Sequence, residues 1–249
     1  MESPKTFSEK LFSWMIKQNR REDPRFTELA DKYLVRRYVA ERVGSQYLTR
    51  LYWEGTLPRL LPFDYLPSRY VIKTNHGSGQ IIRVDGHLDR VEVSSTLEDW
   101  LRSNYYWRDR EYQYLNIRPR VMVEELLDDG LPKGPLDFRF WCFHGVPEVI
   151  QVDNQTHDIN PFFDVRWSMM DLTYRPHAAR PKIGRPERFE EMLAIASRLA
   201  QGFGFVRVDL YNIRGRIVFG ELTFTPVAGH LKFLPGEWDL RLGEKWELR

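Results

Sequence analysis

The sequence contains a single cysteine, which excludes an internal disulfide and a zinc site built from several thiolates. Cys142 falls in an alternating apolar segment, Phe138–Phe143, and is expected in the core. No apolar run approaches the roughly 20 residues that a membrane-spanning helix needs. The first residues also lack the apolar stretch of a secretory signal. We therefore expect a cytoplasmic protein without a transmembrane segment.

The chain also lacks an excess of charge of one sign. Its 37 basic and 35 acidic residues give a net charge of +2, so no strong positive field favours nucleic acid as a partner. Its 249 residues are enough to bury a full core, as one large domain or as two joined lobes. The aromatic content of 14% favours a core rich in β-sheet.

Hydrophobic spacing predicts helices over residues 7–19, 26–43 and 188–201. Ser95 and Glu98 form a capping-box pattern for a further helix that runs to about residue 111. Alternating segments predict the strands 70–75, 81–84, 120–126, 138–143, 148–152, 205–213 and 216–225. Residues 155–186 have no clear period and are expected to form a long loop. Irregular alternation of helices with hairpins indicates an α+β fold rather than a doubly wound parallel sheet.

Lys73 stands at the end of a predicted strand, just before His76-Gly77-Ser78-Gly79. Glycines let backbone N–H groups approach phosphate oxygens, and a lysine at the edge of such a loop neutralises their charge. The lysine precedes the loop, so this is not a Walker motif. An ordinary β-hairpin turn with an exposed lysine is the alternative.

Asp209 and Glu221 lie on two predicted strands joined at Arg214-Gly215, which brings their side chains together. Mg²⁺ accepts one or two carboxylates plus substrate phosphates. Arg207 alternates onto the face of Asp209 and could stabilise transferred negative charge. The alternative is a surface ladder of salt bridges.

Glu124 and Glu125 end the Val-rich strand, where backbone groups could meet an adenine edge; two solvated acids are the alternative. Asp128 and Asp129 precede Gly130 and indicate a turn rather than a sugar-nucleotide metal motif. The sequence contains no Gly-x-Ser-x-Gly nucleophile motif. The long loop offers three candidate carboxylate contacts, with solvated charge as their alternative reading: Arg166, Arg175 and Arg180.

Taken together, these segments resemble the TupA-like family of the ATP-grasp superfamily, found in bacterial surface-polysaccharide gene clusters. The resemblance runs from about Pro4 to Trp238. It is carried by the segments Pro4–Leu11, Ala30–Val39, Lys73–Gly79 and Gly220–Pro226. The sequence departs from the family at Arg37, where Glu is frequent, and at Val227-Ala228-Gly229, where glycines usually follow.

The resemblance implies an ATP-grasp fold, in which two α+β lobes with antiparallel sheets clasp ATP. A short helical segment would precede the lobes. The expected ranges are 1–55 for this helical segment, 56–125 for the small lobe and 126–249 for the large lobe, which would hold the metal site.

The resemblance also implies residue roles. Lys73 would contact the α- or β-phosphate, with Lys32 or Arg36 as a second cation. The other implied nucleotide contacts are the phosphate loop of His76, Gly77, Ser78 and Gly79, the adenine contacts Glu124, Glu125 and Leu127, and Asp137 and Arg139 near the ribose or phosphates. Asp209 and Glu221 would hold Mg²⁺, and Thr223 replaces an asparagine that many superfamily members use as a further ligand.

The implied reaction is ligation of a carboxylate to an amine, with ATP and Mg²⁺ as cofactors and Arg207 and Lys73 as catalytic residues. The substrates would be a small molecule or glycan precursor with a carboxylate, such as a uronic acid, and an amine donor. Three rivals remain open: a glycosyltransferase-like enzyme, direct phosphoryl transfer to a hydroxyl, and a nucleotide-binding module without turnover.

Overall fold

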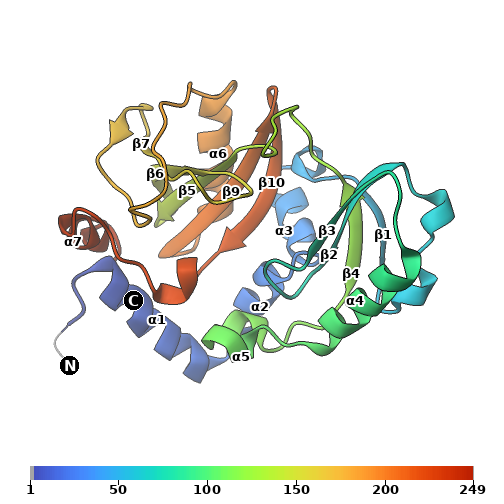
Figure 1. Cartoon of the computed structure of the whole chain (residues 1–249). Coiled ribbons are helices and arrows are strands. Elements are labelled where there is room, and N and C mark those ends of the chain that lie inside the picture. The colour runs from blue at the N-terminus through green and yellow to red at the C-terminus, as the bar shows by residue number, and fades with distance from the viewer. Residues whose placement is uncertain (1–2, 249) are drawn as a thin grey trace. The chain divides into compact units, whose positions relative to one another are not determined.

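The computed structural model describes residues 3–248, which form two compact units (Figure 1). Unit 1 contains the residues up to Arg21, Val39–Tyr47 and the chain from Asp128 onwards. Unit 2 contains Glu22–Tyr38 and Leu48–Leu127. Residues of the range 1–55 therefore belong partly to each unit, and the three ranges expected from the sequence stay a prediction.

Unit 1 is built on a six-stranded sheet whose strand order is β10-β9-β5-β6-β7-β8, with every neighbouring pair antiparallel. The strands are β5 (Asp137–Phe143), β6 (Val146–Asp153), β7 (Phe162–Asp164), β8 (Met169–Met170), β9 (Phe205–Ile213) and β10 (Arg216–Thr223). Its helices are α1 (Phe7–Arg21), α6 (Phe189–Ala200) and α7 (Glu237–Glu244).

One face of this sheet is apolar along its length because it packs against α6. The strands place alternate side chains on opposite faces, and Phe140 lies 6.2 Å from Phe189 of α6 between ring centroids. The Cys142 thiol also faces α6, at 4.0 Å from the Ala196 carbonyl oxygen. Cys142 is fully buried, as the sequence predicts.

The opposite face changes from aromatic to charged side chains along the strands. At one end it is an aromatic core, in which Phe7 of α1 contacts the rings of Trp141, Phe143 and Phe205. Beyond this aromatic core, the same alternation along β5 and β9 places charged residues on this face, among them Arg139 of β5 and its register partner Asp209 of β9. The site described below lies where the aromatic core ends.

Unit 2 contains a four-stranded antiparallel sheet in the order β1-β4-β2-β3. Its strands are β1 (Leu51–Gly55), β2 (Arg69–Thr74), β3 (Ile81–Asp85) and β4 (Val121–Glu125). Helix α4 (Arg90–Arg102) buries Val93 and Leu97 in one core cluster with Ile72 of β2 (Figure 1). The remaining helices are α2 (Pro24–Ala30), α5 (Tyr106–Asp109) and α3 (Val35–Arg42), which begins in unit 2 and ends in unit 1. Short 3-10 turns cover Ser45–Tyr47, Pro58–Leu60, Phe63–Tyr65, Tyr112–Tyr114 and Pro226–Gly229.

The structure confirms the predicted α+β class with antiparallel sheets and N-terminal helices. The predicted capping box is wrong, because Asp89 caps α4 by accepting from the N–H groups of Val91 and Glu92, and Ser95 lies inside the helix. The helix predicted over 26–43 is also wrong as one piece, because Asp31 ends α2 and accepts from the N–H groups of Tyr33 and Leu34 in the turn before α3.

Two further differences concern short elements. The expected loop 155–186 contains β7 and β8, and strand β1 lies in a stretch for which no strand was predicted. Within residues 3–248, no helix has the length and apolarity needed to cross a membrane.

Candidate functional site

Two cations of unit 2 share one nearly buried carboxylate. The Nζ atom of Lys73 lies 2.6 Å from Oε2 of Glu124, and Nη1 of Arg36 lies 2.9 Å from Oε1. Lys73 reaches Glu124 because Val71 pairs opposite Glu124 on β4, which puts Lys73 one diagonal step away on the same face. Arg36 also donates to the hydroxyl and carbonyl of Thr49. Two positive charges against one negative charge make this corner of unit 2 attractive to phosphate.

The glycine loop that follows β2 is anchored at its first residue. Asn75 is fully buried, donates to Asp31 at 2.8 Å and accepts from the backbone N–H of Arg120 at 2.8 Å. Lys32, next to Asp31, donates from Nζ to the carbonyl of Gly77 at 2.7 Å. Lys32 therefore lies at the loop, whereas Arg36 lies beside Lys73, so the two candidate cations occupy different places in unit 2.

Within the loop, Ser78 and Gly79 are exposed and Gly77 is buried. Gly79 has φ of +77°, a left-handed conformation that favours glycine. The imidazole of His76 points away from the exposed part of the loop, and Nε2 lies 3.1 Å from the carbonyl oxygen of Trp100 in α4. Burial lowers the pKa of His76, despite the opposing contact with Trp100. The structure thus gives His76 a partner inside unit 2, and this contact holds the start of the loop against α4.

The three residues predicted to contact adenine differ in whether their backbone groups already have hydrogen-bond partners. Glu124 pairs with Leu51 in the sheet, and the N–H group of Glu125 donates to the carbonyl oxygen of Arg50 at 2.9 Å. In the described chain, no residue pairs with the backbone N–H or C=O group of Leu127, which follows β4. Leu127 is therefore the position of the three with backbone groups available to a ligand.

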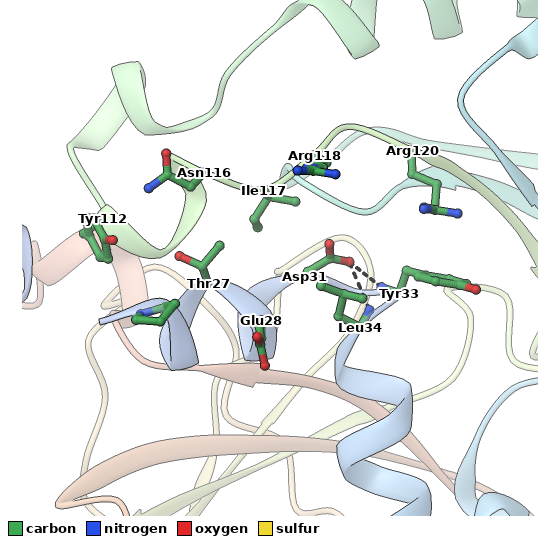
Figure 2. Close-up of a pocket in the computed structure, with 11 residues that line it drawn as sticks. Thr27, Glu28, Asp31, Tyr33, Leu34, Tyr112, Asn116, Ile117, Arg118 and Arg120 are labelled. Atoms are coloured by element: carbon green, nitrogen blue, oxygen red, sulfur yellow. Dashed lines mark hydrogen bonds between the residues drawn. The ribbon is translucent and has the colours of Figure 1, made fainter. Parts of the chain in front are cut away.

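A cavity of about 440 Å³ opens in unit 2 and is lined in part by α2. Its wall includes Asp31, Tyr33, Arg118 and Arg120, and Figure 2 shows the hydrogen bonds of Asp31 to the turn that precedes α3. The Arg120 guanidinium lies 4.4 Å from the Tyr33 ring centroid and pairs with Glu54. None of the predicted site residues lines this cavity.

In unit 1, the two predicted metal ligands are direct neighbours across β9 and β10. Asp209 pairs with Glu221, and Arg207 pairs with Thr223. The register shifts at Gly220, and a glycine suits this position because a Cβ atom there would lie 3.0 Å from the Asp209 carbonyl oxygen. The sequence prediction that these carboxylates converge is consistent with this register.

Arg207 occupies the space between these acids. Its Nε and Nη2 atoms bind the two oxygens of Asp209 at 2.7 and 2.5 Å. The same Nη2 lies 3.4 Å from Oε1 of Glu221 and 3.0 Å from Oγ1 of Thr223, and the Thr223 hydroxyl donates to Glu221 at 3.0 Å. Asp209 is nearly fully buried, whereas the Glu221 side chain is 43% exposed.

Asp137 and Arg139 lie on the same face, one strand further along the sheet. Arg139 pairs opposite Asp209 and donates from Nε to Asp137 at 2.7 Å. Burial raises the pKa of Asp209 to about 7 against the effect of Arg207, and nearby Asp137 adds to the rise. Burial likewise raises the pKa of Asp137, whose Oδ1 atom is buried and has no hydrogen-bond partner among residues 3–248. Burial therefore disfavours the charged form of both carboxylates, even though an arginine contacts each of them.

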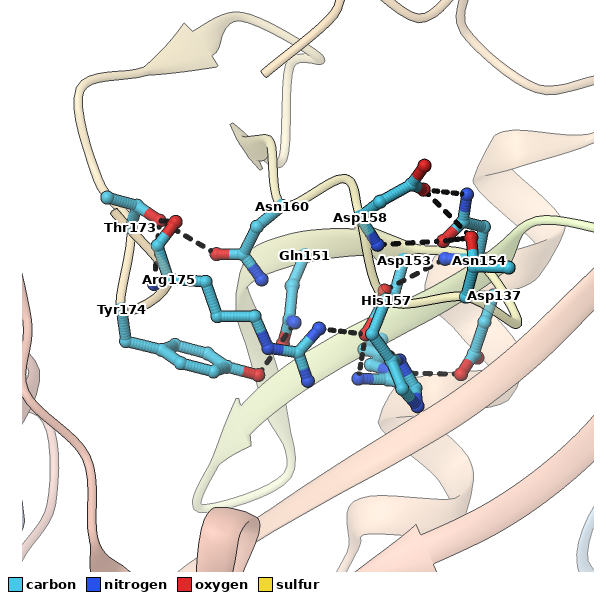
Figure 3. A network of polar contacts seen from close by, with 12 residues as sticks. Asp137, Gln151, Asp153, Asn154, His157, Asp158, Asn160, Thr173, Tyr174 and Arg175 are labelled. Carbon is cyan, nitrogen blue, oxygen red and sulfur yellow. Dashed lines mark hydrogen bonds and ion pairs between the residues drawn. The ribbon is translucent and has the colours of Figure 1, made fainter. Parts of the chain in front are cut away.

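The charged face continues to a network that the sequence analysis missed (Figure 3). Asp153 has no exposed side-chain surface, and its Oδ2 atom accepts from Arg139 at 2.5 Å, Arg175 at 2.7 Å and His157 at 3.0 Å. Burial raises the pKa of Asp153, but contacts from His157, Arg139 and Arg175 outweigh it and leave the pKa lowered. The available signal was the alternation of Gln151 and Asp153 with the apolar residues Ile150 and Val152 at the end of β6.

The residues present fit a Mg²⁺ ion that takes two carboxylates and completes its shell with phosphate oxygens and water. The unpartnered Oδ1 of Asp137 and the raised pKa of Asp209 both indicate acids that a cation would stabilise. Between residues 3 and 248, no three His, Cys, Asp or Glu side chains group closely enough to hold a metal without such help.

The family of this chain follows from its sequence match. The model described as TupA-like ATPgrasp matches residues 9–247, so the protein belongs to the TupA-like ATP-grasp family. The family resemblance seen in the sequence is thereby confirmed. A comparison with curated proteins finds no match.

Several solved ligases are similar at low identity. D-alanine–D-alanine ligase from Bacillus anthracis is 15% identical, with a TM-score of 0.45, over 84% of this chain and 64% of that chain. The Helicobacter pylori enzyme is 14% identical, with a TM-score of 0.49, over 88% and 61%. The ATP-grasp ligase PsnB, complexed with minimal precursor, Mg and ADP, is 13% identical, with a TM-score of 0.43, over 87% and 57%. This chain thus spans less than two thirds of each of them.

Proposed function

We propose that this protein is an ATP- and Mg²⁺-dependent ligase that joins a carboxylate to an amine. The observation that carries the proposal is the meeting of Arg207, Asp209, Glu221 and Thr223 on one face of β9 and β10. A buried arginine beside two carboxylates offers both a place for a cation and a fixed positive charge for a transferred phosphoryl group. Family membership supports ATP as the phosphoryl donor.

In this proposal, unit 2 supplies the contacts to the nucleotide. Lys73 and Arg36 would bind phosphate oxygens, since Glu124 cannot neutralise both. Lys32 would hold the loop of Gly77, Ser78 and Gly79 over the phosphates through its bond to Gly77. The backbone of Leu127, next to Glu124 and Glu125, would meet the adenine edge.

Unit 1 would supply the residues for phosphoryl transfer. Asp209 and Glu221 would hold Mg²⁺, which when bound neutralises phosphate charge. Arg207 would then face the γ-phosphate through the guanidinium that bridges Asp209 and Glu221. Arg139 and Asp137 lie one strand away and would contact the ribose or phosphates.

The reaction would proceed in two displacements. A carboxylate oxygen of the substrate attacks the γ-phosphorus, the bond from this phosphorus to the bridging oxygen of ADP breaks, and an acyl phosphate forms. The amine then attacks the acyl carbon, and the bond between this carbon and the bridging oxygen breaks. Phosphate leaves with that oxygen, and the amine loses a proton to water. Arg207 stabilises negative charge in both steps, and no protein nucleophile takes part.

The acid is proposed to belong to a surface-polysaccharide precursor in the cytoplasm, with a uronic acid as the first class to screen. This part of the proposal rests on the genes with which the family is found.

Trapping the acyl phosphate tests the function directly. The protein would be incubated with Mg·ATP, a panel of carboxylic acids and hydroxylamine, and we expect a hydroxamate together with one ADP for each acid consumed. An acid labelled with ¹⁸O in its carboxylate should transfer one labelled oxygen to inorganic phosphate. ADP formation with a stable phosphate ester, and with no label in phosphate, would instead identify a phosphotransferase.

A further inference from the structure

Three arginines of the segment 155–186 differ sharply in their surroundings. Arg180 pairs with Asp171, a carboxylate whose side chain is 79% exposed, and Arg166 is exposed. Arg175 instead reaches the fully buried carboxylate of Asp153, with 27% of its own side chain exposed. Of the three, only Arg175 is held by a buried partner while keeping access to solvent.

The guanidinium of Arg175 is fixed at one edge and open at the other. Its Nη1 atom binds Oδ2 of Asp153 at 2.7 Å, and its central carbon lies 5.4 Å from the centroid of the Tyr174 ring. Within residues 3–248, neither Nε nor Nη2 of Arg175 has a hydrogen-bond partner. A planar guanidinium fixed in this way presents two parallel N–H groups, which match the two oxygens of a carboxylate.

The neighbouring Tyr174 adds a second donor, because its hydrogen-bond role is fixed by a chain of contacts. The indole N–H of Trp141 donates to Oε1 of Gln151 at 3.4 Å, which orients the Gln151 amide. The Nε2 atom of Gln151 then donates to the Tyr174 hydroxyl at 2.7 Å. That hydroxyl keeps its own hydrogen to donate, and no acceptor for it lies in the described chain.

This pair of donors lies at the end of the charged row that begins at the proposed catalytic residues. Glu221, Asp209, Arg139 and Gln151 are successive register partners across β10, β9, β5 and β6. Figure 3 shows Arg175 and the Tyr174 hydroxyl beside Gln151 and Asp153. Neighbouring strands lie about 4.8 Å apart, so β9 and β6 are separated by about 10 Å, a span that a small substrate can cover.

From this geometry we propose that Arg175 and Tyr174 bind a carboxylate of the acceptor substrate, positioned along the sheet face towards Arg207. Naming this carboxylate as part of the substrate rests on the proposed ligase function. The binding site itself rests on the unpaired donors of Tyr174 and Arg175. Asp153 acts as a positioning residue, because all its contacts are to protein groups and it fixes the open edge of Arg175.

The test is ligand-observed NMR on the full chain with Mg·AMP-PNP present. The probes are L-alanine and D-glucuronate, each paired with its neutral amide, and inorganic phosphate. We expect at least one carboxylate to bind about tenfold or more tightly than its amide, a difference of about 1.4 kcal/mol. Arg175→Ala should abolish this preference, and Tyr174→Phe should weaken it by about fivefold, the loss of one hydrogen bond.

Arg180→Ala is the matched control and should bind the probes like the wild type, since its partner is an exposed carboxylate. Arg175→Lys keeps a positive charge beside Asp153 but loses the two parallel N–H donors of the guanidinium. It replaces Arg175→Ala in the test if that variant does not fold. Equal binding of acids and amides, no binding of any carboxylate by the wild type, or an unchanged preference in the Arg175 variants would overturn the proposal. Preferred binding of phosphate would also overturn it.

The same samples separate this site from the ligase function. AMP-PNP affinity should be unchanged in Arg175→Ala, because no nucleotide contact is assigned to Arg175. A wild type that binds carboxylate through Arg175 but does not bind AMP-PNP would refute the ATP-dependent function and leave the anion site. A wild type that binds AMP-PNP and no carboxylate would refute the site alone.

Discussion

Arg207 binds both carboxylate oxygens of Asp209, at 2.7 Å through Nε and 2.5 Å through Nη2. The two residues are two positions apart on β9, so their side chains lie on the same face of the sheet. Burial raises the pKa of Asp209 to about 7 even though the contact with Arg207 lowers it. A cation that binds Asp209 must share it with Arg207, and the exposed Glu221 is the partner that can complete such a site.

Asp209→Asn and Glu221→Gln should therefore each reduce ADP formation by at least about a hundredfold, as expected when charge stabilisation at a phosphoryl group is lost. ADP release with Mg·ATP measures this effect, and circular dichroism monitors the fold. Glu148→Gln is the matched control, because Glu148 forms a surface pair with Lys245. Full activity in both site variants would remove the metal assignment.

Lys73→Met should weaken the binding of Mg·AMP-PNP by about tenfold or more, since a cation next to phosphate is lost at a cost of about 1.4 kcal/mol. Titration calorimetry gives the affinity. The control is Arg83→Met, which removes an exposed cation opposite Val71 on the neighbouring strand. If both variants lose affinity equally, Lys73 acts only through the general charge of unit 2.

His76→Gln should change the pH dependence of stability more than the affinity for nucleotide. Burial lowers the pKa of His76 below its ordinary value of 6.5, so the folded protein holds this imidazole neutral. The stability it contributes is present above pH 6.5 and is lost as the pH falls below that value, where the unfolded chain takes up the proton first.

Urea unfolding between pH 5 and pH 7 measures this difference. We expect the free energy of unfolding of His76→Gln to depend less on pH than that of the wild type, with AMP-PNP affinity changed by less than about threefold. The exposed His87 supplies the control variant His87→Gln. A large loss of nucleotide affinity with unchanged pH dependence would assign His76 to direct ligand contact instead.

Gly220→Ala should destabilise unit 1 and reduce activity together. The added Cβ would lie 3.0 Å from the Asp209 carbonyl oxygen and 3.2 Å from the Tyr211 ring, an overlap that costs about 1–3 kcal/mol when the backbone must shift. Denaturant unfolding and ADP release measure the two effects. Gly184→Ala adds a methyl group in open space, and equal stability of the two variants would contradict the close approach.

The sequence predicted the parts of this protein that local pattern controls. The alternation in 205–213 and the turn at Arg214-Gly215 predict the pairing of β9 with β10, but the bulge between Phe219 and Glu221, which brings Glu221 opposite Asp209, is not visible in that pattern. Helix α6 and the hairpin at His144-Gly145 are likewise encoded by neighbouring residues. These predictions needed no knowledge of distant contacts.

The missed features depend on distant partners. Strands β7 and β8 have three and two residues, too few for a period to be visible. The imidazole of His76 is directed inward by the carbonyl group of Trp100 in α4, 24 residues later. Asp153 gathers Arg139, Arg175 and His157 from separate segments, so its role emerges only when the sheet has formed.

The central claim, an adenine nucleotide bound with Mg²⁺, is tested most directly by thermal shift with Mg·AMP-PNP, Mg·ADP and Mg·UDP-glucose side by side. A ligand at about 100 times its dissociation constant stabilises the folded protein by about 2.7 kcal/mol, which a melting curve resolves. The account predicts a rise in melting temperature with the adenine nucleotides only, and a smaller rise in Asp209→Asn. A rise with UDP-glucose alone, or none with any nucleotide, would contradict it.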